Sequence, residues 1–159
     1  GVPSRGALGG SEWLFQKAGG LAGEAVGIDL GAEVALQKAM LTLAQRRLVN
    51  SAHDISDGGF ATAMAEACIA HGRGAKVDLP ASADARAHAL LFSEEPTRIL
   101  LSLAPYQLEA VRAVCAELSV PFEAIGTVEG SSLQIGDAVQ AEVTELAEAH
   151  ASALDDIVK

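Results

Sequence analysis

The densest run of polar residues able to do chemistry is Ser-Ala-His-Asp-Ile-Ser-Asp-Gly-Gly, at residues 51–59. Its paired glycines allow the backbone to turn tightly and approach a ligand closely. If a helix starts here, its free N–H groups can hold an anion such as a phosphate. Because two carboxylates repel a bare phosphate, that anion needs Mg²⁺ or carboxylates turned away from it. The candidate binding residues are His53, Asp54, Ser56, Asp57, Gly58 and Gly59.

The same run also fits a purely structural role. Asp57 or Ser56 can cap the helix that follows, while His53 and Asp54 hold the turn through hydrogen bonds. An Asp-Gly-Gly triplet is a weak signal by itself, so the residue types leave both interpretations open.

A second polar cluster is Leu-Phe-Ser-Glu-Glu-Pro-Thr-Arg at residues 91–98. Ser93, Glu94 and Glu95 come just before an expected strand, where they can project from a sheet edge. Glu94 is suited to accept hydrogen bonds from sugar hydroxyls or to coordinate a metal, and Arg98 can pair with either carboxylate. The structural alternative is a solvated turn with a local ion pair, which contributes well under about 1 kcal/mol.

Several other kinds of site have no support in the sequence. Neither a GxSxG nucleophile motif nor a GxxxxGK[ST] phosphate loop occurs. Both cysteines, Cys68 and Cys115, lack a CxxC neighbour, which predicts two buried thiols. No metal site is expected, because metal-ligand spacing is missing around the four histidines, His53, His71, His88 and His150.

Periodic apolar residues predict the elements that position these clusters. Asp29 is expected to cap a helix with Leu36, Met40 and Leu43 on one face. Alternation of Ile99, Leu101 and Leu103 predicts a strand with one buried face. The expected helices cover residues 12–17, 29–47, 59–71, 84–91, 105–118 and 144–157, and the expected strands cover 48–53, 76–79, 97–103, 122–128, 132–135 and 138–143.

This order of elements predicts an α/β (α+β) fold in which helices cover a mixed β-sheet. Residues 1–28, which are rich in glycine, are expected to form a lead-in segment, and residues 29–159 one domain. The final strands, 132–135 and 138–143, are expected to pair as a hairpin across Gly136 and Asp137.

Charge and hydropathy exclude some classes of partner. The formal net charge is −10, which argues against binding to nucleic acid or to an anionic membrane surface. No apolar run approaches the roughly 20 residues that cross a bilayer. With no signal segment at its start, the chain is expected in the cytoplasm.

Four runs of residues together resemble the phosphoribosylformylglycinamidine synthase family. Residues 51–59 resemble the family's SAHDxSDGG run, and residues 9–14 (Gly-Gly-Ser-Glu-Trp-Leu) its GGSEYL run. Residues 91–98 are similar to LFSESxSR, with Glu95-Pro96 in place of the more usual pair. Residues 121–128 (Pro-Phe-Glu-Ala-Ile-Gly-Thr-Val) resemble VPxxxIGTV. The runs occur in family order, and they point to the C-terminal domain of the synthase's second half.

The resemblance implies a fold like the C-terminal domain of AIR synthetase and a share in an ATP-dependent ligase. The whole enzyme would use ATP and Mg²⁺ to phosphorylate the amide oxygen of formylglycinamide ribonucleotide, and ammonia from glutamine would then displace the phosphate. Its main ATP, Mg²⁺ and catalytic residues lie in units upstream of this one. We therefore expect no catalytic residue here, no tight cofactor binding by the domain alone, and an isolated domain without activity.

The resemblance also implies partners. These are the upstream domains of the synthase and, in its small form, a separate glutaminase and a small bridging subunit; the fragment alone is a possible homodimer. An alternative is a non-catalytic module that completes the synthase assembly. A third, weaker possibility is a free-standing relative that regulates the pathway.

Overall fold

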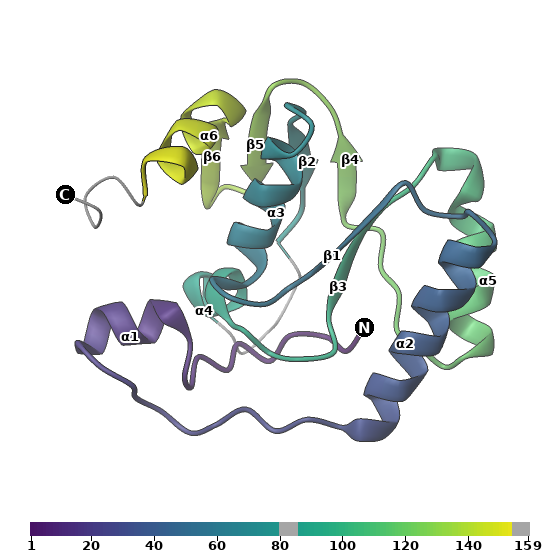
Figure 1. Cartoon of the computed structure of the whole chain (residues 1–159), viewed down its shortest axis with the longest axis horizontal. Helices are drawn as coiled ribbons and strands as arrows, with labels where there is room; N and C mark the ends of the chain where they lie inside the picture. Colours follow the sequence, from purple (N-terminus) through teal and green to yellow (C-terminus); the bar gives the residue numbers. More distant parts are fainter. Residues whose placement is uncertain (80–85, 154–159) are drawn as a thin grey trace. The chain divides into compact units, whose positions relative to one another are not determined.

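The computed structural model describes residues 1–79 and 86–153, which form two compact units. The first unit contains Gly1–Ala63 and the described part of Ser82–Ala124, and the second contains the described parts of Met64–Ala81 and Ile125–Lys159. Their helices and strands are labelled in Figure 1. No helix within the described ranges is long and apolar enough to cross a membrane. The domain boundary expected after residue 28 stays a prediction.

The first unit is built around a two-stranded antiparallel sheet and two long helices. Strand β1 pairs with β3 so that Asp54 lies opposite Ile99 and Ser51 opposite Ser102. Asp29 caps α2 as predicted, because its carboxylate accepts from the N–H groups of two residues in the first turn. The elements are α1 (Glu12–Ala18), α2 (Leu30–Gln45), β1 (Ser51–Asp54), the start of α3 (Gly59–Ile69), α4 (Ala87–Phe92), β3 (Ile99–Ser102), η1 (Pro105–Gln107) and α5 (Leu108–Glu117).

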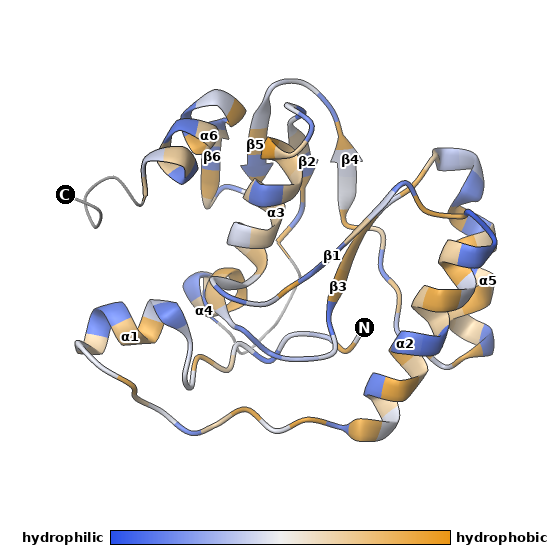
Figure 2. Cartoon of the chain, in the orientation of Figure 1, coloured by the Kyte–Doolittle hydropathy of each residue, from blue (hydrophilic) through white to orange (hydrophobic). Residues whose placement is uncertain are grey.

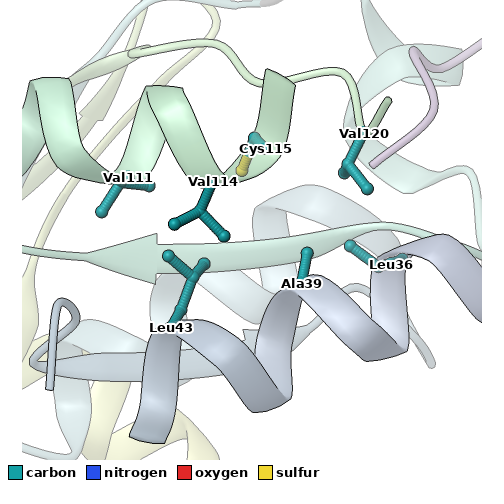
Figure 3. Packing of buried hydrophobic residues seen from close by; sticks show 7 residues of the cluster. All are labelled: Leu36, Ala39, Leu43, Val111, Val114, Cys115 and Val120. Atoms are coloured by element: carbon teal, nitrogen blue, oxygen red, sulfur yellow. The ribbon is translucent and has the colours of Figure 1, made fainter. Parts of the chain in front are cut away.

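The core of this unit lies between α2 and α5, whose buried side chains point toward one another in Figure 3. Ile99, Leu101 and Leu103 pack against this core as predicted, but they are only partly buried, and Leu100 on the other face of β3 is buried to a similar degree. Figure 2 accordingly shows β3 as mostly hydrophobic. Both cysteines are buried, as predicted. The seven buried residues of the core are Leu36, Ala39, Leu43, Val111, Val114, Cys115 and Val120.

The second unit contains a four-stranded sheet in the order β4-β2-β5-β6. Strands β2 and β5 are parallel and the other pairs are antiparallel, so the mixed sheet predicted from the sequence is confirmed. The predicted hairpin is also present, with Ile135 paired to Val139 across the turn that contains Gly136. The elements are β2 (Ala75–Val77), β4 (Gly126–Val128), β5 (Ser132–Ile135), β6 (Val139–Glu142) and α6 (Val143–Ser152).

Element boundaries differ from expectation mainly where backbone geometry interrupts a pattern. Helix α2 ends at Gln45 because Arg47 takes a positive φ of 54°, which a continuing helix does not allow. The strand expected at 122–128 keeps only its last three residues, in β4. Two expected helices extend outside the described residues: the one at 84–91 by its first two residues, and the one at 144–157 by its last four.

Candidate functional site

Pairing of β1 with β3 brings the two polar clusters of the sequence to the same end of one sheet. The loop of residues 55–58 follows β1, and the turn of residues 93–98 precedes β3. The sheet pairing continues beyond the strands, because Ile55 N–H donates to the carbonyl of Arg98 at 3.0 Å. Two segments about forty residues apart in the sequence therefore form one surface.

Gly59 fixes how closely these segments approach. Its φ is +72°, a conformation that L-residues with side chains rarely adopt. A Cβ added at Gly59 would lie 2.7 Å from the carbonyl carbon of Phe92 and 2.8 Å from the carbonyl oxygen of Ser93. The second glycine of the run is therefore required for close backbone contact between the clusters.

Glu94 joins the loop to the N-terminal part of the chain. Its Oε1 accepts a hydrogen bond from Gly58 N–H at 2.8 Å and another from Glu12 N–H at 2.9 Å. The N–H group just before α3 is therefore satisfied by Glu94. The capping role considered for Asp57 or Ser56 is filled at this position by a side chain from the other cluster.

Ser93 and Glu95 point into the protein. Glu95 is 6% exposed and accepts from Ser4 Oγ at 2.5 Å and from the N–H groups of Arg5 and Gly6 at 3.0–3.2 Å. Ser93 is fully buried and lies 3.0 Å from Ser4 Oγ. Arg98 donates to Ser93 Oγ at 3.2 Å and lies 3.9 Å from Glu95. This network holds the first residues of the chain against the turn.

The same network changes the acidity of Glu95. Burial acts to raise the pKa of this carboxyl, but hydrogen bonds from Ser4, Arg5 and Ser93, together with the charge of Arg98, outweigh it and hold the pKa below its ordinary value of 4.5. The charged form is therefore the one that the folded protein stabilises.

This shift predicts a loss of stability in acid. The unfolded chain protonates Glu95 near pH 4.5, whereas the folded protein does so only at lower pH. The contribution of Glu95 is therefore present above about pH 4.5 and lost as the pH falls through the folded-state pKa. Urea unfolding at pH 7 and pH 3 should show a smaller difference for Glu95→Gln than for the wild type. The exposed Glu109→Gln serves as the control, and an unchanged difference in Glu95→Gln contradicts the assignment.

An open groove of about 430 Å³ lies beside the joined clusters. Of the nine candidate residues, Asp54, Ser56, Asp57 and Glu94 line it. The other five, His53, Gly58, Gly59, Ser93 and Glu95, do not contribute to the lining. The clusters thus form one wall, but only part of each faces the groove.

The groove is strongly acidic. Its carboxylates come from Glu33, Asp54, Asp57 and Glu94. Among the described residues of the lining, the only basic one is Arg98, which directs its guanidinium to buried partners. A hydrogen bond from Ser56 is the main reason that the pKa of Asp54 lies below its ordinary value, with His53, whose Nδ1 is 3.6 Å from Asp54, adding to the effect. This carboxylate is therefore charged at neutral pH.

Two further residues line the groove: Glu33, which had no signal in the sequence, and Thr97, which lies in the run of residues 91–98 but was not a candidate. Glu33 on α2 accepts from Thr97 Oγ1 at 2.7 Å, and this hydrogen bond is the main reason that its pKa lies below the ordinary value. Thr97 has a positive φ of 64°, which is rare for a β-branched residue and is characteristic of sites with functional constraint. Glu33 belongs to no recognisable motif, so only the fold could pair it with Thr97.

The lining of the groove bears on which ligands it can take. Within the described ranges, no group of three or more His, Cys, Asp and Glu residues is arranged to hold a metal ion. A phosphate without its own cation would meet four carboxylates in the groove. The acidic lining suits a ligand that brings hydroxyl or cationic donors.

The fold and the motifs match known proteins. Residues 1–137 match the family model described as AIR synthase related protein, C-terminal domain. The phosphoribosylformylglycinamidine synthase subunit PurL of Thermoanaerobacter sp. (strain X514) is 41% identical over 132 residues, which are 83% of this chain and 18% of that protein. PurL of Thermobifida fusca is 41% identical over 150 residues, 92% of this chain and 19% of that protein. The chain thus spans less than a fifth of these relatives.

Solved structures support the fold. PurLQS from Thermotoga maritima matches with a TM-score of 0.68 and 24% identity, over 76% of this chain and 22% of that one. Thermotoga maritima PurL complexed with ATP gives a TM-score of 0.68 at 23% identity over the same shares. The resemblance and the fold class predicted from the four motifs are therefore confirmed.

Proposed function

The chain belongs to the family of AIR synthase related protein C-terminal domains, and we propose that it acts as one domain of a phosphoribosylformylglycinamidine synthase. The observation that carries the proposal is the meeting of two family-like motifs at one groove. In this role the groove is one wall of a cleft that an upstream domain completes. The domain belongs to the second half of the synthase and works in the cytoplasm.

The whole enzyme, in this proposal, is an ATP-dependent ligase of purine biosynthesis that takes its nitrogen from glutamine. ATP supplies the phosphoryl group and Mg²⁺ assists its transfer, and in this proposal both bind mainly in other domains, which is supported by the repulsion between the acidic groove and a phosphate without its cation. The relatives are named as a subunit, which supports an assembly with further chains, and the partners in this proposal are a glutaminase and a small bridging protein. The domain alone is inactive, and its exposed surface leaves a homodimer of the fragment open to test.

Asp57 offers the sharpest test of a binding role. It is exposed, and the neighbouring Gly58 N–H is satisfied by Glu94, so Asp57→Ala should change the free energy of unfolding by less than about 0.5 kcal/mol. If the groove binds substrate or nucleotide, the same variant should lower kcat/KM on the order of tenfold or more. The measurement uses Thermobifida fusca PurL in which the matching region is replaced by this chain, and follows ATP-dependent amidine formation.

The control for this experiment is Glu123→Ala, which removes an exposed carboxylate that does not line the groove. A folded chimera without activity contradicts the proposed function. An active chimera that tolerates Asp57→Ala and Asp54→Ala instead identifies the domain as a structural module of the synthase.

A further inference from the structure

The first eighteen residues, here called the N-terminal strap, attach to the turn that carries the candidate acidic residues. Val2 N–H donates to the carbonyl of Thr97 at 3.1 Å, and Glu95 holds Ser4, Arg5 and Gly6. Farther along the strap, Trp13 stacks on His88 with ring centroids 4.8 Å apart and lies 6.5 Å from Phe92. The strap thus follows the turn and α4 over most of its length.

Glu94 touches the strap and the loop with the same atom. Its Oε1 accepts from Glu12 N–H at the start of α1 and from Gly58 N–H in the loop. Hydrogen bonds to a carboxylate are stronger than neutral ones, and bonds that share a charged group depend on one another. Loss of one donor frees the half-buried carboxylate to turn toward water and weakens its bond to the other.

We propose that Glu94 couples the N-terminal strap to the loop of residues 55–58, so that docking of the strap sets the position of the loop. The position of Gly58 in turn fixes where Asp57 stands beside the groove. Coupling of this kind is reciprocal, so a ligand that orders the loop also favours docking of the strap. The proposal concerns contacts within the first unit and does not depend on which reaction the protein serves.

The strap is suited to release because little of it is buried. Helix α1 has seven residues and none of them is buried. A helix this short is not stable without its contacts, and segments with few buried apolar contacts open at lower free energy than the core. Docking therefore rests mainly on hydrogen bonds along the strap and on the Trp13 stack.

Two measurements on the whole 159-residue chain report on the loop and on the strap. Exchange of the Gly58 amide hydrogen, measured by NMR, reports on the loop, and the Met64 amide farther along α3 is the reference for global opening. Trp13 is the sole tryptophan of the sequence, so its emission reports on the strap. Glu94→Ala should speed Gly58 exchange between about tenfold and hundredfold and shift Trp13 emission to longer wavelength.

A double-mutant cycle decides between coupling and two independent contacts. Trp13→Ala, which removes the stack on His88 and Phe92, should also speed Gly58 exchange, and it should add nothing in the Glu94→Ala background. Glu94→Gln, which keeps an acceptor oxygen, should give a smaller change, and the exposed Gln16→Ala on the same helix should give none. Unchanged Gly58 exchange in Trp13→Ala, or effects that add in full, overturns the proposal.

Discussion

Replacing Gly59 by alanine is expected to lower the free energy of unfolding by about 2 to 5 kcal/mol. The left-handed backbone conformation accounts for about 1 to 2 kcal/mol of this. The remainder arises because the new methyl group would meet the backbone of Phe92 and Ser93, which cannot rotate away as a side chain can. The turn that carries Glu94 would have to move, so the variant should also lose the Gly58–Glu94 hydrogen bond.

Gly19 provides a matched control. Its φ is also +72°, but a Cβ added there meets nothing within 4 Å. Gly19→Ala should therefore show the conformational cost alone, about 1 to 2 kcal/mol. Urea unfolding of both variants separates strain from contact, and equal losses of stability in the two contradict the close approach of Gly59 to the turn.

Glu95→Ala is expected to be the second strongly destabilising change, by about 3 to 5 kcal/mol. It removes the acceptor for Ser4, Arg5 and Gly6 and leaves the buried guanidinium of Arg98 without its counter-charge. Arg98→Met should cost less, because Glu95 keeps its hydrogen bonds from the N-terminal strap. Chemical denaturation of the two single variants and of the double variant measures this asymmetry.

The control pair is Glu109 and Arg112, whose charged atoms lie 3.6 Å apart, closer than those of Glu95 and Arg98. Their side chains are 82% and 50% exposed, so Glu109→Ala should change stability by less than about 1 kcal/mol. A loss in Glu109→Ala as large as that in Glu95→Ala would show that burial does not govern these pairs.

Much of the fold was accessible from the sequence because local patterns encode it. The alternation of Ile99, Leu101 and Leu103 identified β3 and the residues that face the core, and Asp29 identified the start of α2. These signals depend only on residues near one another in the chain. Strand ends were less certain, since the length of β1 is set by its pairing with β3.

The candidate site was only partly predictable for a different physical reason. The sequence marked both acidic residues of the turn as candidates and Arg98 as a partner, but most of their other partners are backbone N–H groups, which almost any residue can supply. Such donors leave no mark in residue types. The pairing of Glu33 with Thr97 likewise required the fold to bring α2 and the turn together.

Because α1 buries no residue, the candidate site should lose its structure at a lower temperature than the core of the domain. Heating should detach the first eighteen residues while the α2–α5 core remains folded, since segments with few buried contacts open first. Helical content measured during such heating follows the core and reports a protein that is still intact. The groove would by then have lost the arrangement of Glu94, so its geometry should change before the core melts, at a temperature set by the contacts of the first eighteen residues.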